Sequence, residues 1–100
     1  MNFRQKVIQI IKKVPYGKVT TYGTVATLAG MPRGARIVGG ILSSCSEKFD
    51  LPWQRVINRH GFISVKSPDH PKQLQKALLE EEGVEVSEDF MIDLLKYGWP

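Results

Sequence analysis

The stretch that decides the fold is TTYGTVATLAGMPRGARIVGGILSS, residues 20–44. Thr20 or Thr21 can cap a short helix that ends at Gly30. Pro32 suits the first turn of a second helix that runs to about residue 44. Two short helices joined by a glycine-containing turn are typical of a helix-turn-helix. The expected apolar side of the first helix consists of Val25, Ala26, Leu28 and Ala29.

The second helix of this pair has two different faces. Adjacent Gly39 and Gly40 each weaken a helix interior by about 1 kcal/mol relative to alanine, so we expect a close approach to a ligand at this point. The alternative is that another helix packs against the glycines, which could hold for Gly39 while Gly40 faces outward. The outward face is small and cationic, which favours nucleic acid, and Arg36 is best placed to reach into a groove. The outward residues are Arg33, Arg36, Gly40 and Ser43 or Ser44, and the apolar ones are Ala35, Val38, Ile41, Leu42 and Cys45.

The charge of the chain is divided unevenly along its length. Residues 1–66 hold eleven Lys and Arg against Glu47 and Asp50, whereas residues 67–100 hold three lysines against eight acids. A basic surface attracts polyanions, of which nucleic acid is the common case, although a merely solvated basic surface would have the same composition.

Length and composition exclude several classes of protein. One hundred residues, 42% hydrophobic and 24% charged, predict a single globular domain over residues 1–100. The basic residues within MNFRQKVIQIIKKV exclude a signal peptide or membrane span, so we expect a cytoplasmic protein, associated with the nucleoid when bound to DNA. With one cysteine and two dispersed histidines, no disulfide framework, metal or other cofactor is expected. A monomer is expected, since no coiled-coil pattern is visible.

Two further helices are predicted. Residues 3–14 have helical apolar spacing after a possible Asn2 cap, and PYG at 15–17 ends that helix. A second helix begins after an Asp69 cap with Pro71 in its first turn, and ends at Gly83. Its expected inward residues are Leu74, Ala77 and Leu78, and its last glutamates oppose the helix dipole without a local reason.

Two small hairpins complete the predicted fold. QRVI and FIS flank NRHG, which predicts a hairpin, or wing, with Gly61 at positive φ. The alternation in VEVSEDFMIDLL favours a second hairpin over a helix. The fold class is therefore mainly α with small β-hairpins, a winged helix-turn-helix domain.

Two separated motifs in register carry a family resemblance. PYGKVTTYGTVATLAGMPRGARIVGG followed by PWQRVINRHGFIS resembles the C-terminal DNA-binding domain of O6-alkylguanine-DNA alkyltransferases, whose signature is Pro-Cys-His-Arg-Val. Here the cysteine position holds Trp53 and the histidine position Gln54. Tryptophan at this position is similar to the alkyltransferase-like proteins, non-enzymatic relatives, and LEEEGVEV and the terminal YGWP resemble their C-terminal ends too.

The chemistry of the substituted residues agrees with that resemblance. Alkyl transfer needs a thiolate and a neighbouring base. Trp53 has no nucleophilic atom, and Gln54 cannot take a proton from a thiol. An indole instead offers a flat face for a base rotated out of the duplex, so no catalytic residue is expected here.

The resemblance implies further roles for named residues. Arg36 matches an arginine finger that replaces the flipped nucleotide in the stack, with its helix in the minor groove, and Tyr22 matches a tyrosine that pushes on the phosphate. Lys66 lies where relatives carry a basic residue at the pocket mouth, and Arg55 is expected to make structural hydrogen bonds below the pocket. The expected lesion pocket consists of Tyr22, Trp53, Val56, Ile63, Ser64, Lys66 and Ser67, and the expected DNA-binding residues are Tyr22, Arg33, Arg36, Gly40 and Ser43.

The leading hypothesis is thus a non-enzymatic sensor that binds O6-alkylguanine in double-stranded DNA, flips it and passes the site to nucleotide excision repair proteins. Two alternatives remain open. One is an alkyltransferase that uses Cys45 as a displaced nucleophile, although Cys45 lies on an apolar stripe. The other is a winged-helix transcription factor, which the small glycine-rich helix disfavours. The alkyl size preferred is not fixed by the sequence.

Overall fold

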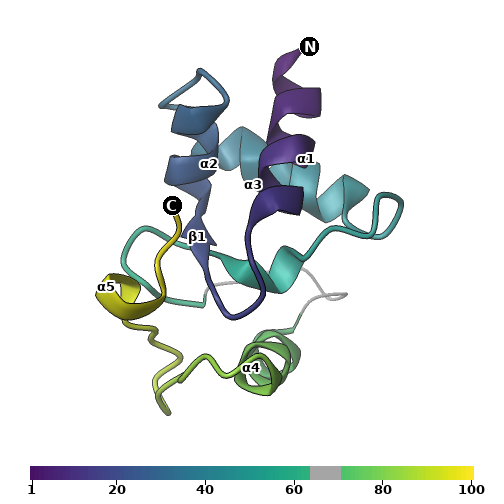
Figure 1. Ribbon diagram of the computed structural model, residues 1–100. Helices are drawn as coiled ribbons and strands as arrows, with labels where there is room; N and C mark the ends of the chain where they lie inside the picture. Colours follow the sequence, from purple (N-terminus) through teal and green to yellow (C-terminus); the bar gives the residue numbers. More distant parts are fainter. Residues whose placement is uncertain (64–70) are drawn as a thin grey trace.

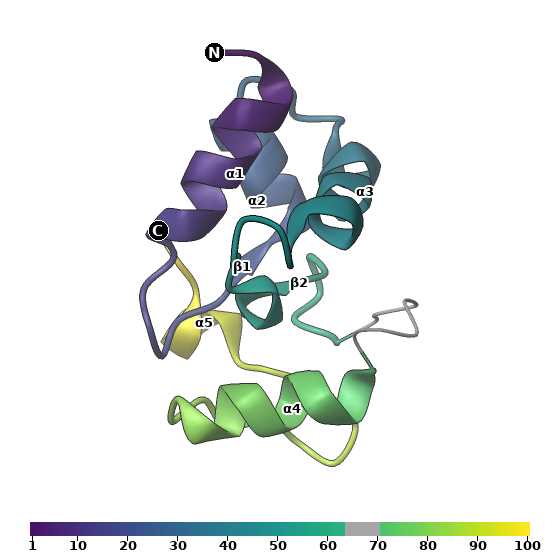
Figure 2. The same cartoon turned by 90° about the vertical axis from the view of Figure 1, so that its right-hand side faces the viewer.

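The computed structural model describes residues 1–63 and 71–100. Helices α1 (Phe3–Lys13), α2 (Tyr22–Leu28) and α3 (Ala35–Cys45) gather at one end of the molecule, and α4 (Lys72–Glu81) lies at the other (Figures 1 and 2). Between them lie strands β1 (Thr20–Thr21) and β2 (Val56–Ile57) and the 3-10 helix η1 (Trp53–Arg55), and the short helix α5 (Leu94–Tyr97) follows near the C-terminus. The fold is mainly helical with a small two-stranded sheet.

Two groups of buried residues form the interior. The N-terminal core joins α1, α2 and α3, and the C-terminal core joins α4 to the segments that follow it. Strand β2 separates them, because neighbouring residues of a strand face opposite sides: Val56 belongs to the first group and Ile57 to the second. The N-terminal core consists of Val7, Ile8, Ile11, Val25, Ala26, Ala29, Val38, Leu42, Cys45, Leu51 and Val56, and the C-terminal core of Val19, Ile57, Ile63, Leu79, Val84, Ile92 and Tyr97.

The prediction of α1 is confirmed. Asn2 accepts a hydrogen bond from the Gln5 backbone amide at 2.8 Å, and the Gln5 side chain accepts from the Asn2 amide at 3.0 Å, which completes a capping box. Lys12 and Lys13 occupy the last turn, where positive charge suits the helix dipole.

The predicted helix pair is present, with two corrections. Thr21 caps α2 by accepting from the Thr24 amide at 3.0 Å, and Gly30 has φ +91° in the turn, as expected. Leu28, however, is 50% exposed rather than part of the apolar side. Pro32 lies in the turn before α3 instead of in its first helical turn, because α3 begins at Ala35 after the Gly34 cap.

The predicted wing is wrong as a hairpin. Strand β2 pairs in parallel with β1, with Thr20 opposite Val56 and Thr21 opposite Ile57. The Asn58 carboxamide accepts from the amides of His60 and Phe62 at 2.9 and 3.0 Å, so the chain closes a tight turn instead of a two-stranded ladder. The expected positive φ at Gly61, +78°, is confirmed.

The second hairpin is also wrong. A turn does form after residue 86, where the Ser87 amide donates to the Met91 carbonyl at 3.0 Å, but its two arms do not pair with each other. The segment after the turn pairs instead with the residues beyond the Asn58 turn, through an antiparallel bridge between Phe62 and Met91. Farther along, the Trp99 amide donates to the Val19 carbonyl at 2.8 Å, which fastens the C-terminal segment beside β1.

Helix α4 is turned relative to the sequence-based expectation. Asp69 lies outside the described residues, and Pro71 is the residue before the helix. The buried positions are Gln75 and Leu79, whereas Leu74 is 42% exposed. The reason is polar: the Gln75 amide donates to the carbonyls of Gln54 and Val56 at 3.0 and 3.1 Å, which requires this face of α4 to point toward η1 and β2. Ala77 and Leu78, also expected inward, are exposed and half-buried.

The structure explains one of the glutamates at the C-terminal end of α4, Glu82. Glu82 directly follows the helix, with its side chain only 5% exposed, and accepts hydrogen bonds from the Gly17 amide and Gln54 at 2.8 Å each and from Arg55 Nε at 2.9 and 3.1 Å. Arg55 also donates to the Val14 carbonyl at 2.9 Å, so the expected structural hydrogen bonds of Arg55 are confirmed. A buried carboxylate at the end of α4 therefore fixes η1 and the loop after α1 together.

The hydrogen bonds also set the acidity of this group. Burial alone would raise the pKa of Glu82, but the bonds from Gly17, Arg55 and Gln54 and the charge of Arg55 hold that pKa below its usual value. Because the folded-state pKa is depressed, the stabilisation is complete above the unfolded-state value of about 4.3 and is lost as the pH falls through the folded-state value.

We expect Glu82→Ala to lower the free energy of unfolding at pH 7 by about 3 kcal/mol, since it leaves Arg55 without its buried partner. Urea denaturation of both proteins measures this difference. It should shrink as the pH is lowered below about 4, where the wild-type carboxylate takes up its proton.

Glu81→Ala is the matched control, because Glu81 precedes Glu82 directly and its side chain is exposed. It should change the free energy of unfolding by less than about 0.5 kcal/mol. If both variants lost the same free energy of unfolding, the hydrogen bonds of Glu82 would not be what stabilises the fold.

Candidate nucleic-acid interface

The outward face of α3 is as small and cationic as the sequence predicts. Arg33, in the turn before the helix, and Arg36, Gly40 and Ser43 are all exposed. A Cβ built at Gly40 would meet no atom of residues 1–63 and 71–100 within 4 Å, so none of the described residues covers this part of the helix. Such a surface suits close approach by a nucleic-acid groove. Sequence reasoning did not assign Ile37, which is 51% exposed beside Arg36 and adds an apolar group to the face.

Tyr22 begins α2 and lies against α3. A Cβ at Gly39 would be 3.9 Å from Tyr22 Cε1, which places the ring of Tyr22 close to Gly39 and agrees with the alternative in which another helix packs against this glycine. The ring packs against the N-terminal core and is half-buried. Burial raises the pKa of Tyr22, so its hydroxyl keeps its proton at neutral pH and can donate to an anionic oxygen.

Trp53 is the first residue of η1, and both its backbone and its side chain are held in place. Its amide donates to the Leu51 carbonyl at 2.8 Å, and its partly buried indole packs against the N-terminal core. The next two residues, Gln54 and Arg55, both bond to Glu82. Glu82 supports the motif from a distant part of the sequence, and the unexplained charge at the end of α4 was the one signal that could have revealed it.

The remaining residues of the predicted lesion pocket are only partly described. Val56 and Ile63 are fully buried, the first in the N-terminal core and the second in the C-terminal core. Ser64, Lys66 and Ser67 lie outside the described residues. Tyr22, Trp53 and Val56 share one core, which brings them into the same half of the molecule. The roles of all seven pocket residues stay predictions.

Cys45 is enclosed in the protein. Its side chain is fully buried in the N-terminal core, and Arg4 Nη2 donates to its sulfur at 3.0 Å. A hydrogen bond with Ser44 lowers the pKa of the Cys45 thiol, against burial, which raises it, and the bond and charge of Arg4 add to the lowering. A more acidic thiol is more reactive only where a substrate can reach it.

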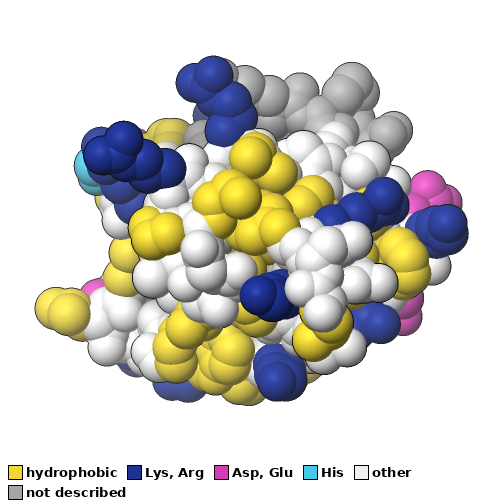
Figure 3. Space-filling model, turned by 90° about the horizontal axis from the view of Figure 1, so that it is seen from above, with side chains coloured by type: hydrophobic (Ala, Val, Ile, Leu, Met, Phe, Trp, Pro, Cys, Tyr) yellow, Lys and Arg dark blue, Asp and Glu magenta, His cyan; other side chains and the backbone are white. Residues whose placement is uncertain are grey.

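The face that includes the turn between α2 and α3 is basic and apolar. Figure 3 shows Lys and Arg side chains around a central apolar area, with carboxylates only at the margins of the view. Large exposed apolar residues of this region include Leu28, Met31 and Ile37. Apolar contacts flanked by positive charge are typical of proteins that press into the minor groove.

The described part of the chain has neither a metal-binding cluster nor a membrane-spanning helix. Residues 1–63 and 71–100 contain no group of three or more His, Cys, Asp or Glu side chains that could hold a metal ion. Among the same residues, no helix combines the length and apolarity that a membrane crossing requires.

Comparison with known proteins places these features in a family. Residues 2–84 match the family model described as 6-O-methylguanine DNA methyltransferase, DNA binding domain. The chain is 53% identical to the DNA base-flipping protein of Escherichia coli K12 over 98% of this chain and 74% of that protein, and 41% identical to Alkyltransferase-like protein 1 of Schizosaccharomyces pombe over 97% and 94%.

A solved structure agrees along nearly the whole length. The crystal structure of S. pombe Atl1 in complex with damaged DNA containing O6-carboxymethylguanine superposes with a TM-score of 0.89 at 40% identity, covering 98% of this chain and 94% of that one. The chain belongs to the family of the 6-O-methylguanine DNA methyltransferase DNA-binding domain and, within it, to the alkyltransferase-like proteins.

Proposed function

We propose that this protein binds O6-alkylguanine in double-stranded DNA, rotates the damaged nucleotide out of the helix toward Trp53, and leaves the alkyl group in place. The relatives named above for base flipping and for a complex with damaged DNA support the first two steps. The bound and bent site then serves as a signal, because a protein that does not repair the base needs a partner that does. Nucleotide excision repair proteins are the partners we propose, and the binding unit is a monomer.

The observation that carries the proposal is the indole at the signature cysteine position. Trp53 lies in η1, and the next two residues, Gln54 and Arg55, bond to Glu82, so the segment that carries the indole is fixed in place. Stacking of a base on an aromatic ring contributes about 1–3 kcal/mol. Rotating a nucleotide out of a duplex costs a few kcal/mol and costs less where the base pair is already weakened by an adduct. Stacking on Trp53 thus offsets much of the cost for a damaged guanine and less of it for a normal one.

Helix α3 supports the DNA side of the proposal. Its exposed glycine and serines let the backbone of the helix enter the minor groove, and Arg36 extends from it to fill the gap left by the rotated nucleotide. Tyr22, whose hydroxyl remains protonated, donates to the phosphate beside that nucleotide. Tyr22 belongs to α2 and Arg36 to α3, and the two helices share one core. The two proposed DNA contacts are therefore held in a fixed position relative to each other.

The position of the Cys45 thiol supports the proposed absence of alkyl transfer. Cys45 is the single cysteine of the chain, and it is fully buried among side chains of the N-terminal core. An in-line attack on the O6-alkyl carbon would require the guanine to enter that core. Gln54, at the position of the family's histidine, bonds to Glu82 and cannot serve as a base.

We expect the wild-type protein to bind a duplex with one O6-methylguanine about tenfold more tightly than the matching guanine duplex, a difference of about 1.4 kcal/mol. Fluorescence anisotropy at a fixed salt concentration measures both dissociation constants. Equal affinities would exclude a role in lesion sensing.

Trp53→Ala and Arg36→Ala should each lose most of this preference, because one removes the stacking face and the other the group that fills the gap. Trp53→Phe keeps a smaller ring and should retain part of it. Lys13→Ala, which removes an exposed charge from α1, should keep the full ratio between the two duplexes. If Trp53→Ala kept the full preference for the damaged duplex, the lesion would not bind at Trp53.

Mass spectrometry separates binding from transfer. After incubation with O6-methylguanine DNA the intact protein should keep its mass, and Cys45→Ala should bind the lesion as the wild type does. A methyl group recovered on Cys45 would contradict the proposal and restore the transferase alternative.

A further inference from the structure

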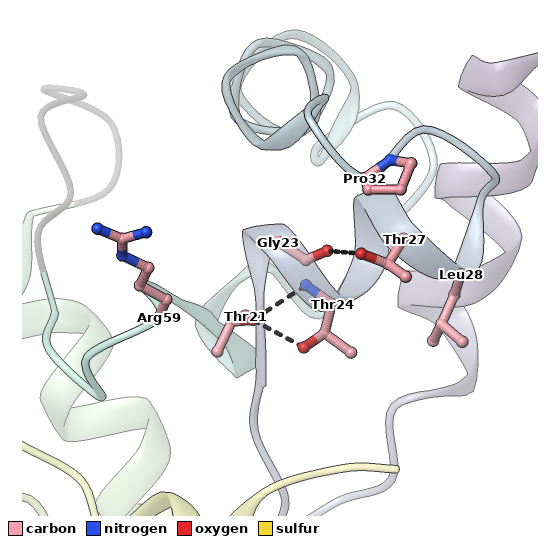
Figure 4. A pocket seen from close by; sticks show the side chains of 7 residues that line it. All are labelled: Thr21, Gly23, Thr24, Thr27, Leu28, Pro32 and Arg59. Carbon is pink, nitrogen blue, oxygen red and sulfur yellow. Dashed lines mark hydrogen bonds between the residues drawn. The ribbon is translucent and has the colours of Figure 1, made fainter.

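A groove beside α2 is not used by the contacts described so far. It has a volume of about 380 Å³ and lies between the start of α2, the turn before α3 and the turn after β2 (Figure 4). The lining residues are Thr21, Gly23, Thr24, Thr27, Leu28, Pro32 and Arg59. Figure 4 shows Arg59 on one side and Pro32 on the other, with Thr21 and Thr24 between them.

We propose that Arg59 and Thr24 form a second anchor for the sugar–phosphate backbone of bound DNA, one that adds affinity without reading the lesion. This inference rests on the proposed function for its ligand and extends it to residues outside the α3 face. The anchor should raise the affinity for damaged and undamaged duplexes equally, whereas the proposed function concerns the preference for the damaged one.

The first support is the charge of the groove. Arg59 is exposed, and all seven lining residues lack a carboxylate. Within the described part of the chain, the hydrogen bonds of Arg59 employ only its Nε, which donates to His60 Nε2 at 3.3 Å. None of the described residues therefore accepts a hydrogen bond from the terminal nitrogens of this guanidinium, which can donate to a phosphate in a forked geometry.

The second support is the set of threonine hydroxyls. Thr27 donates its proton to the Gly23 carbonyl at 2.9 Å, and Thr21 donates to Thr24 Oγ1 at 2.9 Å (Figure 4). The hydroxyl of Thr24 therefore accepts from Thr21, and its own proton has no acceptor among residues 1–63 and 71–100. A hydroxyl held in this way is oriented to donate outward, as a contact to a phosphate oxygen requires.

The third support is rigidity. Arg59 is the residue after Asn58, whose carboxamide closes the turn by accepting two backbone amides. A Cβ at Gly61 would lie 2.5 Å from the Ile92 carbonyl oxygen, so the turn is also packed tightly against the segment before α5. The backbone that carries Arg59 is consequently fixed relative to α2, and less order has to be gained on binding.

The position of the groove matches the path of a duplex on α3. Pro32 forms its rim and directly precedes Arg33, the first cation of the α3 face. A DNA strand whose sugar–phosphate backbone passes from Arg33 over Pro32 would next meet Thr24 and then Arg59. The exposed Leu28 and Pro32 provide apolar surface for the sugars between phosphates.

The test is the salt dependence of binding to undamaged and O6-methylguanine duplexes. Each phosphate contact by a cation contributes about 0.9 to the slope of log affinity against log salt. Between 50 and 200 mM salt, the wild-type affinity should therefore fall about three- to fourfold more than that of Arg59→Ala, on both duplexes. Arg59→Lys should restore the wild-type slope, and Thr24→Val should weaken binding to both duplexes with the slope unchanged.

Lys13→Ala is the control for a simple loss of charge, and it should leave the slope unchanged. The proposal would be overturned if Arg59→Ala had the same salt slope as the wild type or as Lys13→Ala. It would also be overturned if Arg59→Ala lost affinity for the damaged duplex alone. Full affinity for Thr24→Val would remove Thr24 from the anchor. If the wild-type protein bound both duplexes equally well, the proposed function would be overturned instead. The salt slopes would still show whether Arg59 contacts a phosphate. Circular dichroism confirms that each variant is folded.

Discussion

The buried contact between Arg55 and Glu82 determines how the rest of the molecule is assembled. Glu82 follows α4, Arg55 ends η1, and the same two side chains bond to Gly17 and Val14 in the loop after α1. A buried ion pair is costly unless its remaining hydrogen-bonding groups are satisfied, and here the amide of Gln54 and two backbone groups satisfy them. The segment that carries Trp53 is therefore rigid without being part of a long helix or strand.

This arrangement separates recognition from chemistry. The supporting elements hold the signature segment in place whatever residue occupies its first reactive position, so replacing a thiol by an indole changes what the site does without changing its shape. At the next position, where the family has a histidine, Gln54 completes a structural network with Glu82. In the function proposed above, selectivity comes from the cost of extracting a base, and binding energy comes from contacts spread over α2, α3 and their neighbouring turns.

Local sequence signals predicted the helices well and the strands poorly. Asn2 with Gln5, Thr21 with Thr24, and Gly30 act within a few residues of their own positions, and each is found where the sequence placed it. Pairing of β1 with β2 joins residues far apart in the chain. NRHG resembles a hairpin turn because nothing local reveals that the strand before it pairs with β1 instead. The rotation of α4 depends on carbonyls of Gln54 and Val56, which no periodicity within α4 can indicate. For the candidate site, the exposure of Arg36 and Gly40 followed from helical spacing, whereas Glu82 and Arg59 needed the assembled fold.

The proposed function requires that the damaged base leave the duplex and rest against Trp53. A crystal structure of the protein with a duplex containing one O6-methylguanine would show this. We expect α3 in the minor groove, Arg36 within the base stack and the intact methylated guanine against the indole. A guanine still stacked in the duplex, or α3 in the major groove, would contradict it.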